Sequence, residues 1–477
     1  MSALLSIAAV IVPIAHAAGT VCALHALMHV RTAQGTIAWV MCLITFPYVA
    51  IPAYGVFGRS KFEGYVAARR AGNRRLAKLE TRVANALQPH AVEPESCGHA
   101  VFRPLIWMTG LPLTRGNGLR LLVDGDETFA SLLAALRDAR AYILMQFFIV
   151  HSDHIGEQIK DILTAKAKNG VQIYFLYDAY GSRGLAHRYV EELVAAGVSV
   201  CSFRSTRGWK SRFQINFRNH RKITVTDGRM GFVGGLNIGD EYLGRSRRFG
   251  AWRDTHLKVE GPAVQCIQWA FLADWNWATG EIPDLEWTPA SADGTDQKVF
   301  VLPTGPADRL EPCQLFLVAM IHAARTRLWL TSPYFVPDGA LVAALQLAAL
   351  RGVDVRIMLP ERPDHLLVYL CAYSFYDGMM DAGVKMYRYG AGFMHQKVIL
   401  VDDRFSSVGT VNLDNRSLFL NFEITAVCSG AAFAADVETM LMRDFSACRE
   451  VQANDYRDRP WLFKAAVRAA RLLSPIQ

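Results

Sequence analysis

The sequence has 477 residues, 52% of them apolar and 20% charged, with a formal net charge of +8. Such a length suffices for two or three domains, and the positive charge favours an anionic partner, either nucleic acid or an anionic lipid surface. The nine cysteines include no Cys-x-x-Cys pair. This argues against a disulfide framework and a zinc site, and fits a reducing compartment.

Two long uncharged stretches begin the chain. Residues 1–30 contain no Asp, Glu, Lys or Arg, and after Arg31 the next such residue is Arg59. Each stretch exceeds the roughly 20 residues that a helix needs to cross a bilayer. Residues 1–58 therefore predict a hairpin of two transmembrane helices, which we expect to be kinked at Pro13, Pro47 and Pro52. A signal peptide is the weaker alternative, because no basic residue precedes the first apolar run and a second run follows it.

Basic residues dominate the segment after the hairpin. Eight of them stand against only two glutamates before residue 83: Arg59, Lys61, Arg69, Arg70, Arg74, Arg75, Lys78 and Arg82. The positive-inside rule then places residue 59 onward in the cytoplasm. Prolines and glycines between residues 83 and 118 indicate little regular structure. We therefore expect residues 59–118 to form a basic, Pro-rich linker.

The rest of the chain alternates between helical and strand patterns, and does so twice. In the first half, amphipathic helices at 126–140 and 155–170 alternate with buried strands at 141–150 and 171–178. The second half repeats this order, which predicts an α/β fold of two similar sandwich halves about a pseudo-twofold axis. The expected bounds are 119–279 for the first half, 280–298 for an inter-half linker, 299–455 for the second half and 456–477 for a C-terminal helix.

The predicted C-terminal helix is basic and amphipathic. Its residues Lys464, Arg468 and Arg471 share one face, while Trp461 and Leu472 lie elsewhere. This pattern suits a helix at a membrane surface. A terminal helix docked on the globular domain explains it equally well.

One polar motif occurs in each half. The first copy, starting at His220, is HRKITVTDGRMGFVGGLN, and the second, starting at His395, is HQKVILVDDRFSSVGTVN. Both contain His-x-Lys, then an Asp five residues after the Lys and an Asn seventeen residues after the His. Seven of the eighteen aligned positions are identical, where chance gives about one. We therefore predict one active site assembled from the two halves.

Strand geometry brings the polar residues of each copy together, because residues two apart share a face and a hairpin returns the Asn. The set comprises an imidazole, an ammonium and an amide from each half: His220, Lys222, Asn237, His395, Lys397 and Asn412. Such a set suits a phosphate, whose charge the ammonium and amide groups stabilise. One imidazole attacks phosphorus while the other protonates the leaving alcohol. The chemistry requires no metal and no other cofactor.

Four carboxylates are candidates for supporting roles. Asp227 and Asp402 fall at the strand ends and face away from the lysines, which favours a structural role such as capping the turn. Asp254 and Glu423 are better candidates to orient the imidazoles, because a carboxylate on the far ring nitrogen fixes the tautomer. The sequence does not assign either of them to one histidine.

The paired His-x-Lys-x4-Asp motif resembles the signature of the phospholipase D superfamily. The resemblance implies a two-lobed α/β fold and a phosphohistidine mechanism, with the nucleophile in the first half and the acid/base in the second. It also associates the motif aspartates and Glu423 with the site. The candidate catalytic residues are therefore the three motif residues of each half: His220, Lys222, Asp227, His395, Lys397 and Asp402.

More narrowly, the chain resembles the bacterial cardiolipin synthase family over nearly its whole length. It shares the two N-terminal apolar runs, Trp252-Arg253-Asp254, the Ser332–Pro337 run and the Asn412–Ser417 run. One departure is that Gly235 and Thr410 stand where many relatives have Ser. The resemblance implies a multi-pass protein of the bacterial inner (cytoplasmic) membrane, with its catalytic domain in the cytoplasm.

The expected function is transfer of a phosphatidyl group from one phosphatidylglycerol to another, which gives cardiolipin and glycerol. A phospholipase D-type hydrolase would use the same residues with water as acceptor, and nothing in the motif distinguishes it. A nuclease fits the charge but leaves the apolar runs unexplained, and a non-enzymatic scaffold does not explain two intact motifs. We interpret the basic stretch 203–218 as attracting anionic lipid headgroups rather than nucleic acid.

Overall fold

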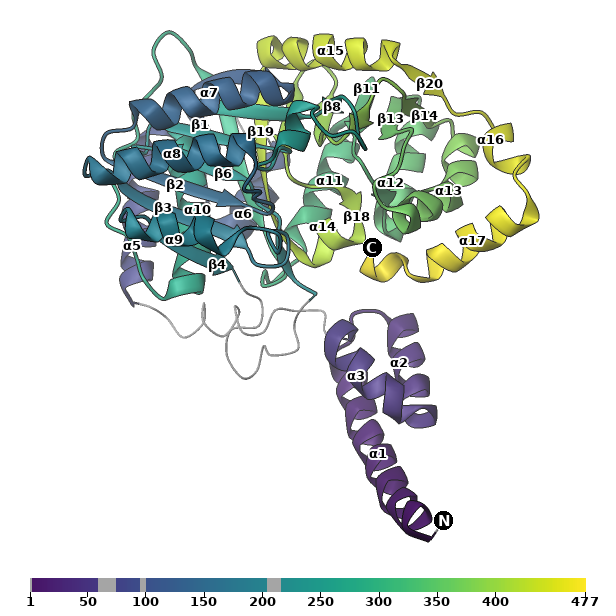
Figure 1. Cartoon of the computed structure of the whole chain (residues 1–477). Helices are drawn as coiled ribbons and strands as arrows, with labels where there is room; N and C mark the ends of the chain where they lie inside the picture. Colours follow the sequence, from purple (N-terminus) through teal and green to yellow (C-terminus); the bar gives the residue numbers. More distant parts are fainter. Residues whose placement is uncertain (1, 59–73, 95–99, 204–215) are drawn as a thin grey trace. The chain divides into compact units, whose positions relative to one another are not determined.

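The computed structural model describes residues 2–58, 74–94, 100–203 and 216–477 (Figure 1). Most of the basic stretch 203–218, and four of the eight basic residues after the predicted hairpin, lie outside these ranges. The chain divides into two compact units. The N-terminal unit contains Met1–Ala71 with Arg204–Arg218, and the main unit contains Gly72–Phe203 with Asn219–Gln477.

Three apolar helices form the described part of the N-terminal unit: α1 (Ser2–His29), α2 (Ala33–Thr45) and α3 (Pro47–Phe57). Among the residues that the structure describes, one helical stretch, Ala9–His29, is long and apolar enough to cross a membrane. The second predicted span is broken at Phe46, which has φ −132° and ψ 58°. Pro47 causes the break, because it has no N–H for the preceding turn and disfavours a helical residue before it. The prediction of two transmembrane helices is therefore corrected to one helix of spanning length in the described ranges, and the kink expected at Pro47 is a break.

The predicted linker 59–118 contains regular structure where it is described, so the expectation of little regular structure is wrong there. Its elements are α5 (Arg74–Leu87), η1 (Gln88–His90), η3 (Ala100–Phe102), α6 (Arg103–Thr109) and the start of β1. The inter-half segment fits its prediction better, because residues 281–296 join two elements without a helix or strand of their own. Leu285 and Trp287 nevertheless anchor this segment in the interior.

The first half runs from β1 to α10: β1 (Thr114–Val123), α7 (Asp124–Asp138), β2 (Tyr142–Phe147), α8 (His154–Lys168), β3 (Gln172–Asp178), α9 (His187–Ala195), β4 (Ser199–Phe203), β5 (Arg218–Asn219), β6 (Ile223–Thr226), β7 (Met230–Gly234), η5 (Asp240–Leu243), β8 (Trp252–Arg253), β9 (Thr255–Glu260) and α10 (Ala263–Thr279).

The second half and the C-terminus run from β10 to η6: β10 (Gln297–Thr304), α11 (Pro312–Ala323), β11 (Arg327–Thr331), β12 (Phe335–Val336), α12 (Gly339–Leu350), β13 (Asp354–Pro360), α13 (Leu366–Asp381), β14 (Lys385–Tyr389), β15 (Phe393–Met394), β16 (Val398–Val401), β17 (Phe405–Gly409), β18 (Leu413–Asp414), α14 (Asn415–Phe419), β19 (Asn421–Ser429), α15 (Ala431–Ser446), β20 (Cys448–Glu450), α16 (Asn454–Arg457), α17 (Trp461–Leu472) and η6 (Ser474–Ile476).

The strands of both halves join in one sheet. Its order is β20-β14-β13-β11-β16-β17-β19-β10-β1-β9-β7-β6-β2-β3-β4. Apart from the edge strand β20 and the short strand β5, which pairs with β19 beside this order, each strand of one half has a counterpart at the matching position of the other half. The halves meet where β1 pairs antiparallel with β10. The mixed α/β fold built from two similar halves is therefore confirmed.

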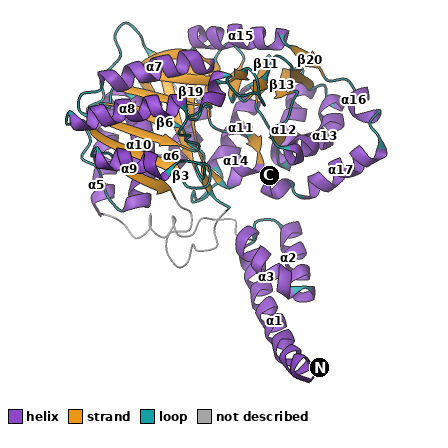
Figure 2. Ribbon diagram, in the orientation of Figure 1, coloured by secondary structure: helices purple, strands orange, loops and turns teal. Residues whose placement is uncertain are grey.

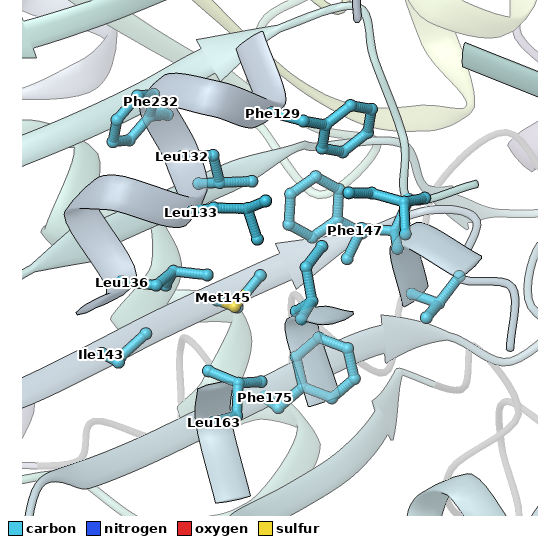
Figure 3. Close-up of a cluster of buried hydrophobic side chains, with 14 of the residues drawn as sticks. Phe129, Leu132, Leu133, Leu136, Ile143, Met145, Phe147, Leu163, Phe175 and Phe232 are labelled. Carbon is cyan, nitrogen blue, oxygen red and sulfur yellow. The ribbon is translucent and has the colours of Figure 1, made fainter. Parts of the chain in front are cut away.

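Helices cover both faces of this sheet (Figure 2). Strand β2 shows why, because its alternate residues are buried on opposite faces. Ile143 and Met145 point into an apolar cluster with Leu132 and Leu136 of α7 (Figure 3). On the other face, Gln146 Nε2 donates to a carboxylate of α10 at 2.7 Å. The sheet is thus a rigid platform for the loops at its edge.

Candidate active site

Each motif folds into the predicted β-hairpin. Strand β6 pairs antiparallel with β7, and β16 pairs antiparallel with β17. Asp227 and Asp402 occupy the two turns with φ of 52° and 54°, a left-handed conformation that Asp tolerates better than most residues. The hairpins therefore follow from local sequence in both halves.

The turn carboxylates bind backbone N–H groups rather than the histidines. Asp227 accepts from residues 140–142 at 2.8–2.9 Å, and Asp402 accepts from residues 325–327 at 2.9–3.3 Å. Five residues of strand span about 16 Å, so these groups lie at the far end of the hairpins from the lysines. The geometry therefore places both carboxylates where they fix the turns of the hairpins.

Each histidine is held by a carboxylate from the opposite half. His220 Nδ1 lies 2.8 Å from Glu423 Oε2, and His395 Nδ1 lies 2.8 Å from Asp254 Oδ2. The backbone N–H of each histidine also donates to the carbonyl of the residue before its carboxylate, at 2.9 and 2.8 Å. The structure thus supplies the assignment that the sequence left open. A carboxylate on Nδ1 favours the Nδ1–H tautomer and leaves a lone pair on Nε2.

The motif lysines are buried beside their own histidines. Lys222 Nζ donates to the His220 carbonyl at 2.7 Å, and Lys397 Nζ lies 3.0 Å from His395 Nε2. Burial lowers the pKa of Lys222 to about 7 and the pKa of Lys397 to about 8. The charge of Lys397 also lowers the pKa of His220, and that of Lys222 lowers the pKa of His395. The two motifs therefore form one electrostatic site.

The imidazoles are neutral near pH 7. Burial lowers the pKa of His220 to about 4, although the Glu423 charge opposes the shift. Burial and the charge of Lys397 likewise lower the pKa of His395, against the hydrogen bond to Asp254. Burial raises the pKa of both carboxyl groups, but their histidine partners outweigh it and hold each pKa below its usual value. A neutral imidazole beside an ionised carboxylate is suited to nucleophilic attack.

The chain matches proteins of known name along nearly its whole length. A family model described as "Cardiolipin synthase, PLD-like domain" matches residues 132–256 and 317–445. The protein named cardiolipin synthase A from Pseudomonas fluorescens (strain SBW25) is 47% identical over 466 residues, covering 97% of this chain and 96% of that protein. Its namesake from Pseudomonas aeruginosa (strain LESB58) is 47% identical over 464 residues, covering 96% and 94%.

The chain belongs to the cardiolipin synthase family. The crystal structure of phosphatidylserine synthase from Haemophilus influenzae Rd KW20 has a similar fold, with a TM-score of 0.58 at 16% identity. That similarity covers 79% of this chain and all of the other. The resemblance inferred from the motifs is thus confirmed, and so is the presence of two phospholipase D-like domains.

In this family member the two motif asparagines have different surroundings. Asn237 Nδ2 donates to Tyr242 Oη at 3.0 Å, and its Oδ1 accepts from the Ile149 N–H at 3.1 Å. Asn412 Oδ1 is buried without a hydrogen-bond partner among the described residues. Asn237 is therefore partly committed to its loop, whereas Asn412 keeps an unused oxygen beside the site.

Gly235 and Thr410 occupy matching positions of the two motifs and have different contacts. A Cβ on Gly235 would lie 2.0 Å from Asp254 Oδ1, so the missing side chain makes room for the carboxylate that holds His395. In the second half, Thr410 Oγ1 accepts from the Ile424 N–H at 2.9 Å. The second half thus has a hydroxyl contact at this position, whereas the first half has a carboxylate close to the backbone.

Several supporting residues were missed by sequence reasoning. Ser417 Oγ donates to Glu423 Oε1 at 2.7 Å. Below the site, Arg253 pairs with Asp444 at 2.7 Å and Arg221 pairs with Asp274 at 2.9 Å. The sequence did contain a signal for these pairs: Asp274 and Asp444 each lie on the apolar face of a helix, α10 and α15. A buried carboxylate of this kind requires a cationic partner.

Proposed function

We propose that the protein is a phosphatidyltransferase that makes cardiolipin and glycerol from two molecules of phosphatidylglycerol. The observation that carries this proposal is the pair of buried histidines, each held on Nδ1 by a carboxylate of the other half. Two such imidazoles can share nucleophilic and acid–base roles at one phosphorus. Membership of the cardiolipin synthase family supports the lipid substrate and the transfer outcome.

In the first step, Nε2 of His220 attacks the phosphorus of phosphatidylglycerol. A P–N bond forms, the bond to the headgroup glycerol breaks, and protonated His395 gives its proton to the departing oxygen. The anionic phosphate supports that protonation by raising the pKa of His395. In the second step, neutral His395 takes the proton from a hydroxyl of the second phosphatidylglycerol. That oxygen attacks phosphorus, the P–N bond breaks, and His220 is regenerated.

The remaining site residues stabilise charge and geometry in this proposal. Lys222 and Lys397 neutralise the phosphoryl oxygens in the five-coordinate transition state, and Asn412 donates its amide N–H to one of them. Asp254 and Glu423 keep each proton on Nδ1 and stabilise the imidazolium or phosphohistidine as it forms.

The membrane placement is part of the same proposal. The apolar stretch Ala9–His29 supports a transmembrane anchor, and α2 with α3, which pack against α1, would return the chain across the bilayer. The excess of basic residues after Phe57 supports a cytoplasmic catalytic domain. In a bacterium this corresponds to a multi-pass protein of the inner membrane.

The test is product analysis with the full-length protein reconstituted in phosphatidylglycerol vesicles. Cardiolipin with equimolar glycerol is expected. Phosphatidic acid as the main product would indicate a hydrolase, and no turnover would contradict both functions. His220→Ala should abolish product, whereas His187→Ala, which changes an exposed histidine of α9, should retain full activity.

A further inference from the structure

The C-terminal helix α17 docks on the main unit. Its Val467 and Ala470 are buried, and the Phe463 ring packs edge-on against Tyr373 of α13 with 5.2 Å between centroids. The Arg471 guanidinium stacks over Phe375 at 5.3 Å. The sequence left two arrangements open for this helix, and the structure shows the one in which it docks on the globular domain.

The opposite face of α17 is also apolar. Trp461, Leu462, Leu472 and Leu473 are 73%, 64%, 81% and 43% exposed. With 3.6 residues per turn these side chains fall on one stripe, together with exposed alanines at 465 and 469. Single exposed leucines are ordinary, but a continuous stripe of large apolar groups marks a contact surface. We call this stripe the outer face of α17.

Basic side chains accompany the outer face. Arg468 lies within it, and Lys464 and Arg471 lie along one edge. Long basic side chains beside an apolar stripe, with a Trp at one end, are the features of a helix that lies in an anionic membrane surface. The apolar atoms enter the headgroup region while the cations remain at lipid phosphates.

The chain segment that follows α17 binds α14, a helix that contacts the active site. After α17, Asn415 Nδ2 of α14 donates to the Ser474 carbonyl at 3.0 Å. The same short helix α14 contains Ser417, which holds Glu423. Helix α14 therefore connects the C-terminal end of α17 to Glu423, the carboxylate that orients His220.

A second exposed apolar pair lies at the start of α13. Leu366 and Leu367 begin α13 and are 65% and 41% exposed. They follow Asp364, which accepts a hydrogen bond from Tyr334 and whose charge acts on Lys397. Both the outer face of α17 and the start of α13 thus expose leucines, and each segment is connected to one half of the site.

We propose that the outer face of α17, together with Leu366 and Leu367, lies in the headgroup region of an anionic phospholipid bilayer and makes the active site open onto the lipid surface. This inference rests on the proposed function and deepens it. A phosphatidylglycerol phosphate reaches His220 while its acyl chains remain in the bilayer. The N-terminal helices then tether the enzyme, whereas α17 orients it.

The first test measures membrane insertion without turnover. Full-length protein is reconstituted in phosphatidylglycerol vesicles whose acyl chains are brominated near the headgroup, and the quenched part of tryptophan emission is compared with that of Trp461→Phe. The substitution should lower the quenched emission. Equal quenched emission from both proteins would overturn the proposal, whether or not the protein makes cardiolipin.

The second test separates orientation from catalysis. Leu462→Ser with Leu472→Ser should lower turnover of vesicle phosphatidylglycerol about tenfold, and leave turnover of a short-chain, monomeric phosphatidylglycerol unchanged. Met442→Ser is the matched control, because it is 49% exposed on α15, at the opposite edge of the main unit from α17 (Figure 1). Equal losses on both substrates, or no loss on either, would overturn the proposal. So would a changed oligomeric state of the double variant in detergent, which would assign the face to a second copy of the chain.

Discussion

Replacing Glu423 by Gln changes one atom of the hydrogen bond between the two halves, and it leaves the side-chain volume almost unchanged. Glu423 is fully buried, and its Oε2 lies 2.8 Å from His220 Nδ1. A glutamine either removes the negative charge or presents an N–H to Nδ1. In the second case the ring proton moves to Nε2, and the nucleophilic lone pair is lost.

The expected size of the defect follows from that distance. Two unit charges 2.8 Å apart attract each other by about 6 kcal/mol at an effective dielectric constant of about 20. This is the upper limit of the loss when His220 becomes cationic on attack. A charged hydrogen bond has a net worth of about 3 kcal/mol at the high end. Since about 1.36 kcal/mol corresponds to tenfold in rate, kcat should fall by about 10²- to 10⁴-fold.

The assay is cardiolipin formation by full-length protein in phosphatidylglycerol vesicles, with the melting temperature measured in parallel. Glu438→Gln is the matched control, because this carboxylate pairs with Arg327 away from the site and its loss should leave kcat unchanged. A Glu423→Gln protein that keeps more than about a tenth of wild-type kcat with normal stability would refute the reasoning.

Because each histidine has its own carboxylate, the two carboxylates can be replaced separately and their effects compared. Asp254→Asn should weaken His395, the acid/base, whereas Glu423→Gln should weaken His220, the nucleophile. A phosphatidyl ester of p-nitrophenol needs no proton on its leaving group, so it should restore first-step turnover to Asp254→Asn and not to Glu423→Gln. The reverse pattern would exchange the roles of the two histidines.

Four further outcomes are expected. His395→Ala, given the p-nitrophenyl ester, should accumulate a phosphatidyl group on His220 detectable by mass spectrometry; an adduct elsewhere would contradict the mechanism. The profile of kcat/KM should rise with pH through about 4, as His220 loses its proton, and fall above about 7, as Lys222 loses its own; an acidic limb near the ordinary histidine pKa would count against the buried neutral imidazole. Asp227→Asn keeps the left-handed turn accessible but weakens three backbone hydrogen bonds. The free energy of unfolding, measured by thermal unfolding, should therefore fall by about 2–3 kcal/mol, with kcat nearly unchanged. Arg253→Met leaves a buried carboxylate unpaired, so the free energy of unfolding should fall by about 3–5 kcal/mol.

Features set by local interactions were predictable from the sequence. The β-branched and apolar residues at 223–226 and 398–401 and the Asp at each turn predicted both hairpins. Strand parity also predicted that Asp227 and Asp402 would face away from the lysines. These features depend on residues within about ten positions of one another, where backbone geometry alone is decisive.

Features set by long-range pairing were not predictable. Glu423 lies 203 residues from His220, and Asp254 lies 141 residues from His395, so only the strand order of the assembled sheet joins them. At Pro47 the sequence predicted a kink, but the structure has a break at Phe46. Hydropathy does not distinguish a kink from a break, because the missing N–H of Pro47 acts through a single hydrogen bond. The helices before residue 114 were hidden because prolines at 89 and 104 stand in the first turns of η1 and α6, where proline is tolerated.

The exchange of carboxylates between halves also governs when the protein first becomes reactive. During synthesis, the first half emerges with His220 and Lys222 but without Glu423, and it presents Asp254 before His395 exists. In a partly made chain the tautomer of His220 is therefore not fixed by Glu423. The acid–base partner, His395, has not yet been synthesised. Reactivity toward membrane lipids begins only when the ribosome has passed residue 423 and the second half has closed over the first. The protein is thereby kept inactive until both halves are folded and each carboxylate faces its histidine.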